Sequence, residues 1–253
     1  IAPSVNSFTL SDTALKSGDN ATVTLVFSEA VASFSSSADV TVNNGTLTSM
    51  SSSDNITWSG TFTPSTNTDN ATNTLSLATS YTDTAGNAGP SATTANYEVD
   101  TMVPTISSVT ASWGAYLNET EDDSSGTVTV VTSDAENSQT VTVSLNGTNY
   151  TGTVSDNSTT VTIAASGLQD LTDGSSYPLT TNVSDVAGNA ATENTGTSFT
   201  YDKTSPTLAE TTSVPSLTND NSTQYTFSSN EGGTISIGGS CSCDNSTAVA
   251  VNM

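Results

Sequence analysis

The sequence predicts an all-β fold in which antiparallel β-sandwiches follow one another along the chain. Short stretches of apolar residues alternate with Thr and Ser, which is the pattern of strands buried on one face only. Gly, Asn, Asp and Ser separate these stretches, as in the turns of antiparallel sheets. Two motifs recur at one fixed spacing, which indicates a tandem array of one structural unit.

The repeat is about a hundred residues long. The segment Asp83-Thr-Ala-Gly-Asn87 returns as Asp185-Val-Ala-Gly-Asn189, 102 residues later. The segment Val99-Asp100-Thr-Met-Val-Pro104 returns at the same offset as Tyr201-Asp202-Lys-Thr-Ser-Pro206. We therefore expect a first unit at residues 1–100, a second at 101–202 and the N-terminal part of a third at 203–253, with short linkers that proline stiffens.

Each of the first two units offers about seven short strands. In the first unit, the alternating apolar residues that indicate strands are Val23, Leu25 and Phe27, then Ile56, Trp58 and Phe62, then Leu75 and Leu77, and finally Tyr97 and Val99. The second unit marks them with Val128 and Val130, with Val141, Val143 and Leu145, with Val161 and Ile163, with Leu179 and Val183, and with Phe199 and Tyr201. Seven strands in a hundred residues are typical of an immunoglobulin-like two-sheet sandwich, although the paired cysteines and buried tryptophan of antibody domains are absent. One helical turn is expected at Leu168–Leu171 and no other helix.

The amino-acid composition alone would predict a disordered chain. Val, Leu, Ile and Phe make up 46 of 253 residues, Ser and Thr make up 93, and the net charge is −23, a profile that favours disorder. The regular placement of the apolar residues is the reason to expect a folded chain.

The charge limits the partners and the chemistry. With 25 acidic and two basic residues, we expect neither nucleic acid nor anionic membrane surfaces as partners. The chain has no histidine, so Ser-His-Asp or Cys-His catalysis and His-ligated zinc are excluded. No window approaches 18 apolar residues, so no membrane insertion is expected. Because Ile1 opens without an initiator Met or a leader pattern, we expect a mature or excised piece.

The two cysteines, Cys241 and Cys243, are too close for an unstrained bridge and too few for a zinc site. A disulfide to a strand outside the sequence and a pair of free thiols are both open.

These motifs resemble those of the bacterial immunoglobulin-like repeats of large surface adhesins and biofilm proteins. The resemblance covers nearly the whole chain and is carried by the D-x-A-G-N segments, the D-T-x-x-P style linkers and strand ends such as Val26-Phe27-Ser28-Glu29-Ala30. It implies an extracellular, cell-surface location, calcium at domain junctions and the role of a stalk. The glycine-rich nonapeptide calcium repeat and a separate adhesive module are missing from this sequence.

Strand parity predicts where the acidic residues gather. In a seven-strand sandwich the chain enters at one pole and leaves at the other, so the connections after the second and sixth strands lie beside the incoming linker. The first junction is then expected to gather Asp100, Asp134, Glu136, Asp185 and Asn189, and the second Asp202 and Glu231. The matching positions of the first unit are Glu29, Asp83 and Asn87. The acidic run 119–123 is expected at the opposite pole of the second unit.

Carboxylates that converge without Lys or Arg repel one another, and bound cations or protonation relieve the repulsion. Ca²⁺ is the expected cofactor because it takes six to eight oxygen ligands in flexible geometry. The alternative is that Asp and Asn in D-x-A-G-N only build a tight turn, with Gly supplying positive φ. Each loop can do both.

Three functions compete. The first is a non-enzymatic extracellular stalk, or extender region, of an adhesin, stiffened by Ca²⁺, with neighbouring repeats or other copies of the protein as partners and a surface ligand that the sequence does not identify. The alternative is a subunit of an extracellular filament or surface layer, in which another subunit donates the strands that the third unit lacks, unless the natural chain continues past Met253. The third, an enzyme with a carboxylate pair, is not expected, because the acids cluster in turns at domain ends.

Overall fold

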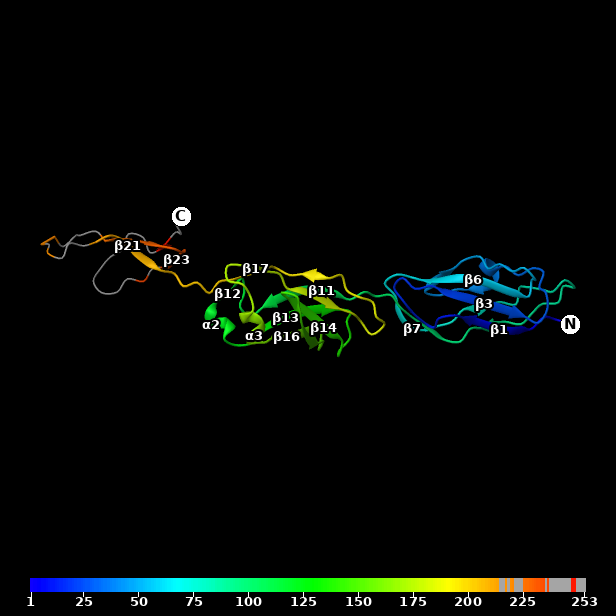
Figure 1. The fold of residues 1–253 in the computed structure, drawn as a ribbon. Coiled ribbons are helices and arrows are strands. Elements are labelled where there is room, and N and C mark those ends of the chain that lie inside the picture. The colour runs from blue at the N-terminus through cyan, green and yellow to red at the C-terminus, as the bar shows by residue number, and fades with distance from the viewer. Residues whose placement is uncertain (214–216, 218, 221–224, 235, 237–246, 249–253) are drawn as a thin grey trace.

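The computed structural model describes residues 1–213, 217, 219–220, 225–234, 236 and 247–248. Figure 1 shows the first two units as two bodies of strands that lie end to end, with the described strands of the third unit beyond them. The expected all-β fold of successive immunoglobulin-like sandwiches is confirmed.

Two layers of strands make up the first unit. One is an antiparallel sheet in the order β1-β3-β6-β5, formed by β1 (Val5–Leu10), β3 (Ala21–Phe27), β6 (Thr57–Pro64) and β5 (Gly45–Leu47). The other holds two short sheets in the orders β2-β10-β7 and β4-β8-β9, formed by β2 (Ala14–Lys16), β10 (Tyr97–Asp100), β7 (Asp69–Asn73), β4 (Val40–Thr41), β8 (Ser76–Leu77) and β9 (Ala92–Thr93). The first strand divides between the layers, since β1 pairs antiparallel with β3 while β2 pairs parallel with β10.

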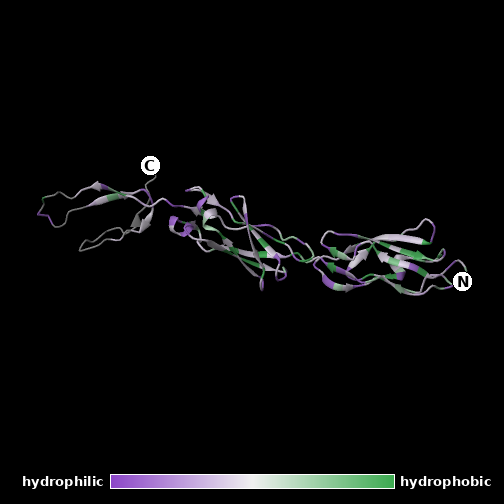
Figure 2. Cartoon of the chain, turned by 60° about the horizontal axis from the view of Figure 1, so that its bottom comes forward, coloured by the Kyte–Doolittle hydropathy of each residue, from purple (hydrophilic) through white to green (hydrophobic). Residues whose placement is uncertain are grey.

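Alternation along the strands decides what is buried. In β3, Val23, Leu25 and Phe27 are fully buried, while Thr22 is exposed. The buried apolar residues form two separate cores. One is made by residues from the range 8–99 and the other by residues from the range 113–201. Figure 2 shows hydrophobic residues along the strands of both units and hydrophilic residues in the loops at their ends. Each unit thus has its own core, while the unit boundaries at residues 100 and 202 remain a proposal.

The second unit repeats the first with one change. Its strands are β11 (Thr105–Ala111), β12 (Tyr116–Leu117), β13 (Gly126–Ser133), β14 (Thr140–Leu145), β15 (Thr148–Thr153), β16 (Ser158–Ile163), β17 (Ser176–Tyr177), β18 (Thr180–Val183), β19 (Asn194–Thr195) and β20 (Phe199–Tyr201). They form sheets in the orders β11-β13-β16, β12-β20-β17 and β15-β14-β18-β19. The fourth strand, β15, pairs with the third strand here, whereas its counterpart β5 pairs with β6.

A two-residue turn explains this change of sheet. Asn146 and Gly147 connect β14 to β15 with φ values of 49° and 79°, and Leu145 pairs with Thr148 across the turn. Two consecutive positive φ values match the twist of a tight hairpin, and Asn-Gly is the preferred sequence for it. The turn therefore returns the chain directly along β14.

Two helical turns contradict the expectation of a single one. The expected turn at Leu168–Leu171 overlaps α3 (Ala165–Gln169), but α1 (Ser36–Asp39) and α2 (Glu119–Asp122) were not expected. In α2, the Asn118 side chain accepts from the Glu121 N–H, and the Glu121 side chain accepts from the Asn118 N–H. This capping box, Asn-x-x-Glu, is a local helix signal that outweighs the loop-like composition of the acidic run.

The third unit is described only in part. Antiparallel pairs join β21 (Leu208–Thr212) to β22 (Thr226–Ser229) and β23 (Gly233–Thr234) to β24 (Thr247–Ala248). The strand expected near Phe227 is present. Ile235, Ile237, Cys241 and Cys243 lie outside the described residues, as does most of the stretch on which strand donation depends.

The Asn146–Gly147 turn gives a direct test of this fold. Replacing Gly147 with Ala places a Cβ at φ 79° and is expected to destabilise the second unit by about 1–2 kcal/mol. Calorimetry of the full chain should show one transition shifted down by several degrees. Gly233→Ala is the control, because an added Cβ meets no atom within 4 Å there and the residue has no positive φ. Equal effects of both variants would refute the turn assignment.

Candidate functional site at the junction of the first two units

Asp100 lies at the centre of the junction. It ends β10 and is in register with Lys16 of β2 on one side and Asp69 of β7 on the other. Residues in register project from the same face of a sheet, so these three side chains share the outer face, while Leu15 and Val99 point into the core. Two carboxylates therefore stand directly opposite each other at the end of the first unit.

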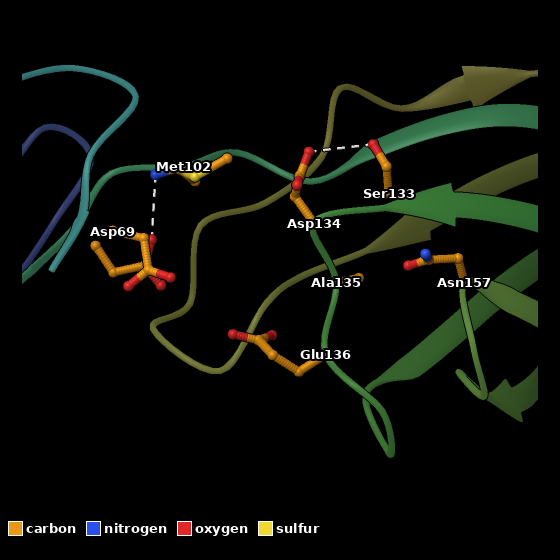
Figure 3. Close-up of a pocket in the computed structure, with 8 residues that line it drawn as sticks. Asp69, Met102, Ser133, Asp134, Ala135, Glu136 and Asn157 are labelled. Atoms are coloured by element: carbon orange, nitrogen blue, oxygen red, sulfur yellow. Dashed lines mark hydrogen bonds between the residues drawn. The ribbon is translucent and has the colours of Figure 1, made fainter. Parts of the chain in front are cut away.

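The second unit adds its own carboxylates from the loop after β13. A hollow between the units is lined by residues of both: Asp69, Asp100, Met102, Ser133, Asp134, Ala135, Glu136 and Asn157. Figure 3 shows the Glu136 side chain extending toward the side on which Asp69 lies, and the Asp134 carboxylate turned toward Ser133. The Ser133 hydroxyl donates to Asp134 over 3.1 Å. Parity thus brings both acidic residues to this pole, but only Glu136 extends toward the first unit.

The loop from Asp185 to Asn189 completes the junction. The Asp185 carboxylate is buried and accepts from the Asn189 backbone N–H at 2.7 Å and from its side-chain amide at 2.8 Å. The same amide donates to the Asp100 carbonyl at 3.0 Å, and the Asn189 Oδ1 accepts from the Ser17 N–H at 2.8 Å. Glu136 accepts from the Val186 N–H at 3.0 Å. The loop therefore connects the incoming linker, the first unit and Glu136.

Burial and repulsion act on Asp100. Burial raises the pKa of the Asp100 carboxyl, and repulsion from Asp185, Asp69 and Glu136 adds to the rise, while the Met102 N–H, which donates to it at 3.1 Å, opposes it. The ionised junction is thus under electrostatic stress. Lys16 is the nearby cation, and its Nζ lies 3.5 Å from the Gly188 carbonyl oxygen.

The side chains that gather at the junction suit a hard cation, because Asp, Glu and Asn offer carboxylate and amide oxygens as ligands. Within the described residues, however, no three acidic, histidine or cysteine side chains stand close enough together to form a ready ligand set. A bound ion would therefore require the exposed side chains of Asp69 and Glu136 to move toward Asp100.

The other two predicted places differ from this one. At the N-terminal pole, the Asn87 amide donates to the Asp83 carboxylate at 2.7 Å. This bond is the main reason that the pKa of Asp83 lies below its usual range. Glu29 lies in the loop after β3. At the second junction, Asp202 accepts from the Thr204 N–H, and Glu231 accepts from the Asn230 amide at 3.2 Å. In the part of the third unit that the structure describes, Asp202 and Glu231 make no hydrogen bond to each other.

The acidic run 119–123 lies at the opposite pole, beside Tyr201 and the outgoing linker. Tyr201 donates to the buried Asp122 carboxylate, and this bond, with burial, raises the pKa of Tyr201 to about 12. Glu121 closes the capping box of α2. The Gln169 amide donates to Asp123 at 3.4 Å, so three of the four acids in the run have hydrogen-bond partners within the unit.

Asp69, Lys16 and Ser17 are junction residues that sequence reasoning missed. The same parity argument would have found them, because the connections after the first and fifth strands lie at the C-terminal pole of a unit.

Residues 1–99 match the family model of the bacterial Ig-like domain, so the first unit belongs to that class of domain, as the resemblance implied. The second unit has the same strand order apart from β15 and repeats the D-x-A-G-N loop.

Three solved structures from bacterial ice-binding adhesins are similar to the chain. One, from a 1.5-MDa adhesin retained at the host cell surface, is 23% identical, with 80% of this chain and 65% of that chain covered and a TM-score of 0.40. A Ca²⁺-stabilised adhesin of an Antarctic bacterium is 21% identical, with 83% and 51% covered and a TM-score of 0.39. An immunoglobulin-like domain of the M. primoryensis adhesin is 29% identical, with 40% and 96% covered and a TM-score of 0.29.

The chain thus spans 65% and 51% of the length of the first two structures. No curated protein matches it. None of the helices in the described residues has the length and apolar character that crossing a bilayer requires.

Asp100→Asn tests the electrostatic stress. Because the folded state holds the proton on Asp100 more tightly than the unfolded chain, its ionisation destabilises the fold as pH rises through the raised pKa. In metal-free buffer the variant should therefore melt higher than the wild type at pH 7, and the difference should vanish below the ordinary pKa of a carboxyl. Melting temperatures between pH 3 and 7 provide the measurement.

Asp54→Asn is the control of opposite sign. Hydrogen bonds from the Thr57 and Ile56 N–H groups lower the pKa of Asp54, so its ionised form stabilises the fold above that pKa. This variant should lower the melting temperature at pH 7. A destabilised Asp100→Asn at pH 7 without metal would contradict the stress at the junction.

Proposed function

We propose that the chain is a non-enzymatic stalk segment of an extracellular, cell-surface adhesin whose junctions are stiffened by Ca²⁺. The observation that carries the proposal is the position of Asp100 between two sandwiches, opposite Asp69 and beside a hollow that Glu136 also lines. Burial, with repulsion from Asp185, Asp69 and Glu136, raises the pKa of Asp100 there. A divalent cation bound there relieves the repulsion and joins groups from both units.

The class of domain supports the mechanical part of the proposal. The first unit is a bacterial Ig-like domain, and the first two units lie end to end with separate cores (Figure 1). A row of such units forms an extended rod, and the bending stiffness of that rod depends on the junctions between units. Neighbouring repeats are then the immediate partners, and the surface ligand is not identified.

Asp69, Asp100 and Glu136 are the groups that would hold the ion at the first junction, with Asp185 contributing charge nearby. The carboxylate of Asp185 already accepts two hydrogen bonds from Asn189, and Asp134 is bonded to Ser133. Asp202 and Glu231 at the second junction, and Glu29, Asp83 and Asn87 at the N-terminal pole, remain candidate ligands by analogy of position.

The alternative, a filament or surface-layer subunit that is completed by strand donation, stays a prediction. It depends on the strands of the third unit, of which only β21 to β24 are described.

Calcium titration tests the proposal. Saturating Ca²⁺ should raise the melting temperature of the full chain by about 5 °C or more, since an ion bound only by the docked state adds about 2.7 kcal/mol at a hundredfold excess over Kd. Removal with EDTA should reverse the shift and make the chain more flexible by small-angle scattering. Glu136→Gln and Asp69→Asn should weaken both responses.

Glu193→Gln serves as the matched control, because Glu193 is an exposed carboxylate of the second unit that lines neither hollow at the junction. Unchanged melting and scattering in the wild type with and without Ca²⁺ would remove calcium from the mechanism.

A further inference from the structure

The D-x-A-G-N loop occurs twice with the same internal geometry. In the first unit the Asn87 N–H donates to Asp83 Oδ1 at 2.8 Å and its amide to Asp83 Oδ2 at 2.7 Å. In the second unit Asn189 makes the same two bonds to Asp185 at 2.7 and 2.8 Å. The glycines Gly86 and Gly188 have φ values of 86° and 89°. The two loops are therefore built alike, whatever surrounds them.

Only the second loop touches another unit. Asn87 is exposed, whereas Asn189 is 4% exposed and makes two further hydrogen bonds, to the Ser17 N–H and to the Asp100 carbonyl. The Lys16 ammonium also approaches the Gly188 carbonyl, while a Cβ added at Gly86 would meet no atom within 4 Å. These contacts are not needed to form the loop, since the first unit forms it without them.

The two extra bonds fall where the parallel ladder of β2 and β10 ends. Lys16 and Asp100 are its last paired residues, so the next groups, the Ser17 N–H and the Asp100 carbonyl, have no further ladder partner on these strands. The Asn189 side-chain carbonyl accepts from the Ser17 N–H, and its amide N–H donates to the Asp100 carbonyl, as a peptide group of a neighbouring strand would. A buried polar group is stable only when its partners are satisfied, and here both sides satisfy each other.

We infer that Asn189 is a clip that docks the second unit onto the first by extending the β2–β10 ladder of the first unit, without any cation. The partner surface is the end of that ladder, Ser17 N–H plus Asp100 carbonyl. Asn suits the position because its neutral side chain both donates and accepts, whereas an Asp would place a further carboxylate among Asp100, Asp185 and Glu136. The inference shares the stalk role of the proposed function and is independent of calcium.

Limited trypsin digestion of the full chain tests the clip, because Lys16 and Lys203 are the only two basic residues. Lys16 is half-buried and the N–H of the bond after it is held by Asn189, while Lys203 is exposed and provides the internal reference. In Asn189→Ala, cleavage after Lys16 should accelerate about tenfold relative to cleavage after Lys203, as expected for the loss of one or two hydrogen bonds.

Asn87→Ala is the matched control. It removes the matching side-chain bond from Asn87 to Asp83 within its loop, keeps the backbone bond and removes no contact to another unit, so cleavage after Lys16 should stay within about twofold of the wild type. Equal acceleration in both variants, or none in Asn189→Ala, would overturn the inference.

A second measurement reports geometry and not stability. Residual dipolar couplings should show a fixed mutual orientation of the first two units in the wild type and in Asn87→Ala, and its loss in Asn189→Ala and Asn189→Asp. A retained orientation in both Asn189 variants would show that Asn189 stabilises only its own loop.

Both measurements are to be made in EDTA and in saturating Ca²⁺. An effect of Asn189→Ala that persists in EDTA supports the clip, even if the wild type shows no calcium response and the calcium part of the proposed function fails. An effect seen only with Ca²⁺ would refute the clip and leave the calcium junction standing.

Discussion

The junction between the first two units has to hold like charges together. Asp69 and Asp100 are cross-strand neighbours at the end of the first sandwich, and Glu136 and Asp185 approach them from the second. Nothing in the strands themselves requires this arrangement. It follows from the topology, which brings the last strand of one unit and two loops of the next to the same place.

Two kinds of interaction counter this repulsion. Neutral hydrogen bonds from Asn189 connect the ladder end of the first unit to the loop of the second, and they involve no cation. A bound cation would act on the carboxylates alone. The division makes physical sense, because hydrogen bonds give direction while charge neutralisation gives most of its stabilisation without fixing an angle. A stalk built this way would keep its alignment without calcium and gain stiffness with it.

The two cores explain why so polar a chain folds. Threonine and serine occupy outward positions of strands whose inward positions hold Val, Leu, Phe and Tyr, so few apolar residues suffice to fill a thin sandwich. The cost of the thin core is modest stability in each unit. Contacts at the junctions therefore matter more here than between larger domains.

Alternation, turn residues and strand parity are properties of local order and connectivity. The strands, the repeat and the pole that holds Asp100, Glu136, Asp185 and Asn189 could therefore be predicted from the sequence. It also contained the Asn118 capping box and the Asn146–Gly147 turn, which local rules could have identified. Three further facts became visible in the folded protein alone: Asp69 faces Asp100, Asp134 turns to Ser133, and Asn189 reaches Ser17. These facts depend on the registry of β7 with β10, on one side-chain rotamer and on how two rigid bodies dock, and no local pattern records any of the three.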